Sequence, residues 1–367
     1  MHLAWRWFTG LSFDQEIPHH STFSKNRHGR FQKSNLFQQL FEEIVDRCQA
    51  AGLVEGEHLS VDGSFLPANA SRLSRIPREQ LREAAHVKRT VREYLTDLEQ
   101  ENPVEEPAHQ QDQVSTTDPD STYSTKGSRP AELGYFNNYL IDNKSCVILG
   151  VQATAARLSQ ESTAARERIT RSAQRQGRFP QSVAADTTYG NGELLAWLEE
   201  RGITPYIRVK ESPAPKSTLY GIEKFTYIRE TNSYQCPAGK RLSYVGVNAI
   251  NRTHVYVATR KRCRDCPQKT QCTRGHYRQV AVHVHEPARQ RARERAKLPA
   301  FGRAQCHRRK VEALFAELKN QIGLRRVRLR RMKFVREQFY LAATAQNLKR
   351  LARYLKSKSL ESAPIPI

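Results

Sequence analysis

The chain has 367 residues, and its 60 Lys and Arg against 37 Asp and Glu give a formal net charge of +23 at pH 7. A chain of this length can bury a substantial core and is expected to hold two domains, or one domain with a large insertion. The charge indicates a polyanionic partner, by default nucleic acid. The sequence has no run of 18 apolar residues and no secretory pattern at its start, so we expect a cytoplasmic, nucleoid-associated protein without a membrane partner.

The first residues, "MHLAWRWFTGLS", are apolar and favour a chain that begins inside a helical region. From Asn35, apolar residues recur at helical spacing until Gly52, which predicts a helix. Residues 1–56 are therefore expected to form a partial helical N-terminal region.

The stretch "HLSVDGSFLPAN" alternates apolar and polar residues between Leu59 and Phe65, which predicts a strand. Asp62 lies within it, although Asp is depleted in strands, and such local conflicts tend to mark functional positions. The alternative is an exposed Asp at a strand end or edge.

The segment that follows mixes helix, linker and hairpin patterns. Pro77 opens a charged helix that is expected to run to about Glu101, and residues 102–130 are polar, rich in Pro, Ser and Thr, and read as a partly disordered linker. Two strand-like runs around "IDNKS" predict a hairpin, and a helix is expected from about Gln160 to Gln176.

The stretch "SVAADTTYGNGELLAWLEERGITPYIRV" predicts a strand ending at Asp186, a helix, and a second strand from Thr204 to Val209. A strand–helix–strand unit implies parallel strands, and ligand sites of open α/β sheets lie at the carboxyl ends of such strands. Asp186 is placed there, with a cap of the next helix as the alternative reading. Residues 57–210 are thus expected to form the first part of an α/β core.

Residues 211–300 break this alternation and predict a β-rich insertion. Four cysteines lie in it, Cys236, Cys263, Cys266 and Cys272, and the C-x₂-C spacing of the middle two makes the set a candidate for a structural, tetrahedral Zn²⁺ site. The alternative is four unligated reduced thiols. The remaining cysteines, Cys48, Cys146 and Cys306, are interpreted as core or incidental thiols.

Residues 301–357 are expected to complete the core with the helix "HRRKVEALFAELK", the basic run "GLRRVRLRRMK" and a last amphipathic helix. At 100° per residue, Arg308, Glu312 and Lys319 fall within about 40° of one another, beside the apolar stripe. The simple alternative is a solvated face with an i,i+4 ion pair between Arg308 and Glu312. At +23, the runs "RQRARERAKLP" and "RRVRLRRMK" favour contacts to a DNA backbone.

Asp62, Asp186 and Glu312 are of the kind that hold Mg²⁺ or Mn²⁺, since hard cations take carboxylate oxygens and share them with substrate phosphates. A pair of such ions can activate water and stabilise the leaving oxygen of a phosphoryl displacement. With 37 acidic residues in the chain, other triplets are open on this ground alone.

Three segments in order resemble a family of enzymes. "LSVDGSFLPANAS" resembles the first-Asp strand of DDE-type insertion-sequence transposases, "VAADTTYGNGELLAWLEERGITPYI" is similar to their second-Asp segment, and "RRKVEALFAELK" is similar to the signature with Tyr, Arg, Glu and Lys separated by two, three and six residues. The resemblance covers nearly the whole chain, tail included.

The resemblance implies a ribonuclease-H-like mixed sheet flanked by helices, with Asp62, Asp186 and Glu312 as catalytic, metal-binding carboxylates. It implies DNA contacts from Arg308 and Lys319, and we add Tyr189, Arg325 and Arg326 as DNA-binding residues. Two departures stand out: Gln305 occupies the signature's Tyr position, and the family's longer N-terminal DNA-binding region is expected to be truncated in residues 1–56.

The sequence therefore predicts a DNA transposase that hydrolyses phosphodiesters and transfers strands at insertion-sequence ends, as a homo-oligomer when active. Its partners would be terminal inverted repeats and target DNA. Two alternatives stay open: a nuclease of the same fold without strand transfer, and an inactive DNA-binding remnant.

Overall fold

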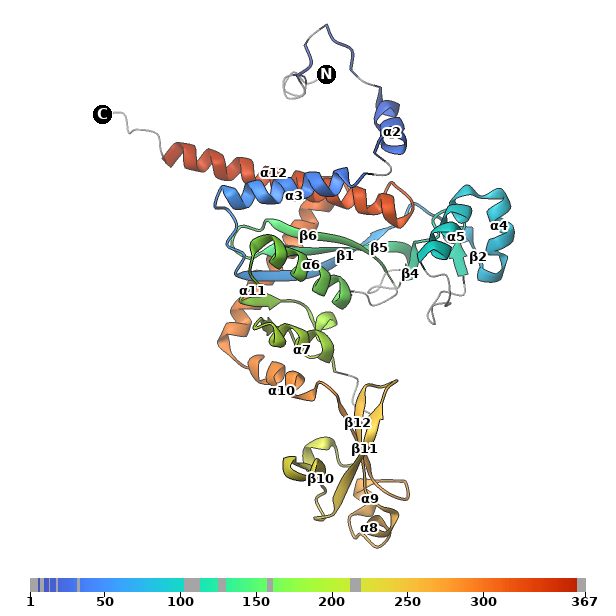
Figure 1. Cartoon of the computed structure of the whole chain (residues 1–367), viewed down its shortest axis with the longest axis vertical. Coiled ribbons are helices and arrows are strands. Elements are labelled where there is room, and N and C mark those ends of the chain that lie inside the picture. The colour runs from blue at the N-terminus through green and yellow to red at the C-terminus, as the bar shows by residue number, and fades with distance from the viewer. Residues whose placement is uncertain are drawn as a thin grey trace.

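The computed structural model describes residues 6, 10–12, 14–17, 19–31, 34–101, 113–124, 130–156, 161–211 and 219–361. Over these ranges the chain is a mixed α/β protein, as predicted (Figure 1). No helix among the described residues is long and apolar enough to cross a membrane. The helices are α2 (His20–Gly29), α3 (Leu36–Ala50), α4 (Leu81–Val87), α5 (Arg89–Glu101), α6 (Glu161–Gln176), α7 (Gly192–Glu200), α8 (Arg260–Arg264), α9 (Lys269–Cys272), α10 (Glu286–Arg295), α11 (Pro299–Asn320) and α12 (Met332–Glu361).

A six-stranded mixed sheet forms the centre of the molecule. Its strand order is β4-β5-β1-β7-β8, with β6 also paired to β5. The strands β4, β5, β1 and β6 pair antiparallel, whereas β7 lies parallel to both β1 and β8. The bounds are β1 (His58–Pro67), β4 (Thr122–Ser124), β5 (Glu132–Asp142), β6 (Ile148–Ala155), β7 (Ser182–Ala184) and β8 (Thr204–Tyr206). The predicted strand at Asp62, the hairpin and the parallel strand–helix–strand unit are all present.

Helices cover both faces of this sheet. Tyr139 of β5 stacks on Phe315 of α11 at a centroid distance of 4.7 Å, and its hydroxyl donates to Gln346 of α12 at 3.0 Å, so α11 and α12 share one face. The helix α6 packs on the other face, where Gly150 of β6 leaves room for the stem of Arg168. The helix α3 runs beside α12 (Figure 1).

The segment between Arg75 and Ser124 differs from its prediction. The expected helix from Pro77 to Glu101 is two helices, α4 and α5, because the backbone is extended at Lys88 (ψ 108°) and lets Leu81 and Val91 pack together on Val114. Residues 113–124, inside the expected linker, form β3 (Gln113–Ser115), paired to β2 (Arg75–Pro77), and the sheet strand β4. Residues 102–112 and 125–129 lie outside the described residues.

The predicted β-rich insertion is a separate antiparallel sheet of order β13-β12-β11-β10-β9, which extends away from the central sheet along the long axis (Figure 1). Its strands are β9 (Thr226–Ile228), β10 (Ser233–Gln235), β11 (Arg241–Asn248), β12 (Thr253–Val257) and β13 (Gln279–His283). The helix α10, which the sequence assigned to the insertion, packs on α7 and β8, so it belongs to the core.

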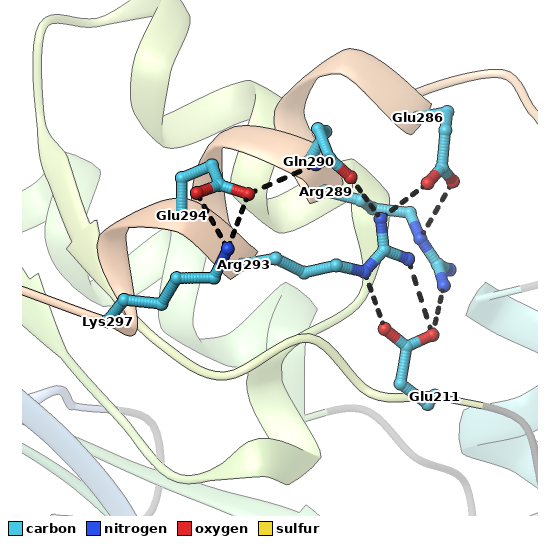
Figure 2. Close-up of polar contacts among 7 residues, drawn as sticks. All are labelled: Glu211, Glu286, Arg289, Gln290, Arg293, Glu294 and Lys297. Atoms are coloured by element: carbon cyan, nitrogen blue, oxygen red, sulfur yellow. Dashed lines mark hydrogen bonds and ion pairs between the residues drawn. The ribbon is translucent and has the colours of Figure 1, made fainter. Parts of the chain in front are cut away.

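Two arginines of α10 join the points where the chain enters and leaves the insertion. Arg293 contacts Glu211, before the insertion, at 2.8 Å and Glu286, after it, at 2.6 Å. Arg289 contacts the same two carboxylates at 2.8 and 3.1 Å, and Figure 2 shows all four side chains converging. The arginine-rich run therefore closes the root of the insertion by ion pairs.

Candidate active site

Strand β1 sets the position of Asp62. Its side chains alternate between the sheet faces, and Asp62 and Ser64 both point towards α11, where they contact Arg308 and Lys319. The carboxylate of Asp62 is 14% exposed, so it lies at the margin of the core rather than at a free strand edge.

Parallel pairing brings the strand before Asp186 beside β1. The register of β1 on β7 joins Leu59 to Val183 and Ser60 to Ala184, and Asp62 and Asp186 each follow two residues after this last pair. Burial, and after it the charges of both carboxylates, raise the pKa of Tyr189. Asp186 accepts a hydrogen bond from the backbone N–H of Thr188 at 2.8 Å and caps a short 3₁₀ turn, whereas α7 is capped by Asn191.

The helix α11 brings Glu312 to the same place. The guanidinium of Arg308 donates from one nitrogen to Asp62 at 2.7 Å and from another to Glu312 at 3.3 Å. The simple i,i+4 pair is thus present, but Arg308 also crosses to the sheet, and Glu312 keeps 58% of its side chain exposed. The guanidinium of Arg308 is therefore shared by the carboxylates of Asp62 and Glu312.

Two of the three carboxylates border an open depression of about 430 Å³. Asp62, Glu312 and Lys319 line it, and Lys319 donates to the hydroxyl of Ser64 at 2.8 Å. Asp186 does not line it, and no group of three or more His, Cys, Asp or Glu side chains among the described residues is arranged to hold a metal ion. The donor set still fits a hard cation, because the carboxylates of Asp62 and Glu312 are already arranged around one positive charge.

Tyr189 is a correction to the sequence-based site. It is 2% exposed, and burial raises its pKa, so it cannot stack on or bind DNA in this arrangement. Its hydroxyl lies near Gly63, where a Cβ would come within 3.6 Å of it, and beside the buried guanidinium of Arg168. Tyr189 therefore supports the turn after Asp186 from within the core.

Arg325 and Arg326 are exposed and follow the end of α11. Arg326 donates to the carbonyl of Ala68 at 3.4 Å, just beyond β1, as Lys319 reaches Ser64 within β1. Lys319 and Arg326 thus contact β1 and the residue that follows it, whereas Arg325 donates to the carbonyl of Lys319 at 3.3 Å and to Asn320 at 2.8 Å. By contrast, the arginines of α10 are paired within the chain, including Arg291 and Arg295 with Glu199, which does not support the predicted DNA contacts of that run.

Gln305 was noted in the sequence only as a departure from a signature. Its amide nitrogen donates to the carbonyls of Ala185 at 3.1 Å and Tyr206 at 2.7 Å, and its oxygen accepts from Nε of Arg308 at 3.0 Å. Its spacing of three residues from Arg308 places both on one helix face, which is the sequence signal for this contact.

The four cysteines of the insertion line one small cavity. The backbone N–H of Lys240 points at the sulfur of Cys236 at 3.3 Å, and the pKa of Cys272 is raised by burial and further by the other three thiols. Of the other cysteines, Cys48 is buried and Cys306 exposed.

Two comparisons with known families concern separate parts of the chain. A family model described as a transposase DDE domain matches residues 235–352, and one described as a transposase domain (DUF772) matches residues 1–29. Both models are described as transposase domains. The match to the DDE-domain model contains Arg308 and Glu312 and begins after Asp186.

Comparisons with individual proteins add less. No curated protein matches the chain. Among solved structures, the piggyBac transposase synaptic complex with hairpin DNA is similar at a TM-score of 0.23 and 8% sequence identity, over 96% of this chain. The chain spans 66% of the length of that relative's chain.

Proposed function

We propose that the chain is a DDE-type DNA transposase whose ribonuclease-H-like core is the central sheet with α6 and α11. The observation that carries the proposal is the convergence of Asp62 and Glu312 on Arg308, in a chain with two transposase-domain matches. Asp186 follows β7, the strand that pairs parallel to the strand of Asp62. Arg308, Glu312 and Lys319 match the Arg, Glu and Lys of the Tyr-Arg-Glu-Lys signature. Arg308 and Lys319 contact Asp62 and Ser64 of β1, and Arg308 also contacts Glu312.

Asp62, Asp186 and Glu312 would hold Mg²⁺ or Mn²⁺, which supplies activation of water and neutralisation of charge on the leaving oxygen. We assign DNA contacts to Lys319, which is partly buried beside Ser64, and to the exposed Arg325 and Arg326, because closely spaced cations fit a phosphate backbone. The buried contacts of Tyr139 and Gln346 fix α11 on the sheet and so fix Glu312.

The proposed reaction has two displacements at phosphorus. In the first, a water oxygen bonds to phosphorus, the P–O3′ bond breaks and a 3′-hydroxyl is freed. In the second, that 3′ oxygen attacks a phosphodiester of target DNA, and the target's own 3′ oxygen leaves with the proton. The active form is proposed to be a homo-oligomer, because two element ends must meet.

The test is Mg²⁺-dependent cleavage of a plasmid carrying the DNA that flanks the gene. Wild type is compared with Glu312→Gln and with Glu200→Gln, a control on α7 whose side chain is 68% exposed. Cleavage at the element ends by wild type and the control, with loss in Glu312→Gln and retained DNA binding, supports the proposal.

Other outcomes separate the alternatives. Equal cleavage by Glu312→Gln removes that carboxylate from the site, and cleaved but never joined DNA indicates a nuclease. Binding without cleavage by any of the three proteins indicates a non-catalytic remnant.

We also propose that Cys236, Cys263, Cys266 and Cys272 bind one structural Zn²⁺, which draws the four thiols lining one cavity into a tetrahedron. The insertion has a small buried core of Phe225, Leu242, Tyr256, Ala258 and Val280, so a metal would stabilise it. Zinc content of the full chain should fall in Cys263→Ser and not in Cys306→Ser. A wild-type chain that stays zinc-free after growth with zinc would refute this site.

A further inference from the structure

One amide links the three carboxylate-bearing segments of the site. Gln305 uses its side-chain nitrogen for Ala185 and Tyr206 and its oxygen for Arg308. The two carbonyls end the neighbouring parallel strands β7 and β8, so the amide spans the strand ends from the face of α11.

Two of these contacts, to Ala185 and to Arg308, lead to carboxylates. Ala185 directly precedes Asp186, and a hydrogen bond to its carbonyl restrains the peptide that joins the two residues. Arg308 reaches Asp62 and Glu312 through its two terminal nitrogens, while its Nε stays on Gln305. A guanidinium has its donors in a fixed fork, so fixing Nε fixes where the other two nitrogens point.

Arg308 donates to the same two carboxylates that a divalent cation would bind. Its positive charge is shared by Asp62 and Glu312, and its side chain is only 16% exposed. A cation that binds these carboxylates therefore competes with the two terminal nitrogens, whereas the Nε contact to Gln305 involves neither carboxylate.

We propose that Gln305 is a positioning residue that anchors Arg308 at Nε, so that its terminal nitrogens pass from the carboxylates to a DNA phosphate when a divalent cation binds. The proposal rests on the function proposed above. It makes Gln305 a working part of the site in this chain. A Tyr hydroxyl has a single hydrogen to donate and could not serve both carbonyls.

The proposal predicts opposite effects on metal binding and on chemistry. Without its anchor, Arg308 competes less well for Asp62 and Glu312, so Gln305→Met should bind Mn²⁺ more tightly, by a few-fold. The same loss leaves Arg308 poorly oriented towards phosphate, so cleavage should slow by roughly 10- to 100-fold, as for other groups that orient a site's reactive residues. A purely structural defect would weaken both.

The experiment is a double-mutant cycle on the full chain with Gln305→Met, Arg308→Met and the pair. Mn²⁺ affinity is measured by electron paramagnetic resonance without DNA, plasmid cleavage is measured separately, and thermal unfolding of each variant reports its stability. In the Arg308→Met background, Gln305→Met should change Mn²⁺ affinity and cleavage by less than about twofold, because the anchored group is gone.

Weaker Mn²⁺ binding by Gln305→Met, or equal losses with and without Arg308, would overturn the proposal and leave Gln305 a tie between strands. Wild type that binds Mn²⁺ but cleaves no DNA would remove the proposed transposase activity, and the Mn²⁺ affinities would still decide the role of Gln305. Wild type that binds no Mn²⁺ would overturn both.

Discussion

Glu317 lies on the same helix as Glu312 and is expected to act on stability alone. It contacts Arg350 at 2.7 Å and Lys349 at 2.9 Å, both on α12, and only 11% of its side chain is exposed. Burial by itself would raise its pKa, but hydrogen bonds from Arg350 and Lys349, the charge of Arg350 and a hydrogen bond from Gln346 together lower it to about 2 from 4.5. Glu317→Gln removes the charge that joins α11 to α12.

The lowered pKa sets the size and the pH range of the effect. A fall from 4.5 to about 2 corresponds to about 3 kcal/mol, at roughly 1.4 kcal/mol for each tenfold change in proton affinity. Because Lys349 is 35% exposed and partly screened by solvent, we expect Glu317→Gln to lower the free energy of unfolding by about 2 to 3 kcal/mol at pH 7. A lowered folded-state pKa stabilises above the unfolded value, so this difference should be complete above pH 4.5 and shrink as pH falls towards 2.

The assay is urea unfolding followed by circular dichroism at several pH values between 7 and 3. Glu312→Gln is the matched control on α11, because that side chain is 58% exposed and its loss should cost within about 0.5 kcal/mol. Equal stabilities of the two variants at pH 7, or a Glu317→Gln difference that does not narrow in acid, would refute the reasoning.

Three further perturbations test other parts of the fold by the same unfolding assay. Burial raises the pKa of Asp118 from 3.8 to about 6, so the protonated side chain stabilises the fold fully below pH 3.8, and this stabilisation is lost as pH rises through 6. Asp118→Asn should therefore make the free energy of unfolding depend less on pH over this range, and an unchanged pH dependence would contradict the prediction. Gly190→Ala should lower the free energy of unfolding by more than about 2 kcal/mol, because the added Cβ would overlap the carbonyl oxygen of Arg208. Gly202→Ala has open space around its Cβ and should cost about 1 kcal/mol, from backbone strain at φ +70°. Equal costs for the two variants would argue against the overlap. Arg293→Met should lower stability by about 1 kcal/mol at low salt and by less in high salt, and no salt dependence would count against the ion pairs at the root of the insertion.

Local patterns predicted the elements that carry the carboxylates. Alternation at Asp62 and the strand–helix–strand unit after Ser182 are set by side-chain periodicity, which acts within a few residues. The helix stripe of Arg308 and Glu312 followed from spacing alone, and in the structure Arg308 contacts both Asp62 on the sheet and Glu312 on its own helix. Their DNA and metal roles remain proposals.

Contacts between distant residues were not predictable in this way. Asp118 was assigned to a linker because its neighbours are polar, yet it accepts hydrogen bonds from Tyr135 and from the backbone of Arg331, more than 200 residues further along. Arg331 takes a left-handed backbone (φ 71°) and also pairs with Asp120 at 2.7 Å. Polar composition alone could not distinguish this buried network from a solvated loop.

Tyr189 shows the same limit at the site itself. Its short segment has no periodicity, so its burial depends on Gly63 of another strand leaving space for the hydroxyl. The double donation of Gln305 likewise depends on two strand ends that only the fold brings together.

The ion pairs at the root of the insertion have a consequence for how the chain could be rebuilt. Glu211 and Glu286 meet at Arg293, so the chain leaves the core and re-enters it at nearly one point (Figure 2). A short flexible bridge could therefore replace the whole β-rich arm without stretching α7, α10 or α11. The core and the β-rich insertion can thus be exchanged between proteins as separate parts.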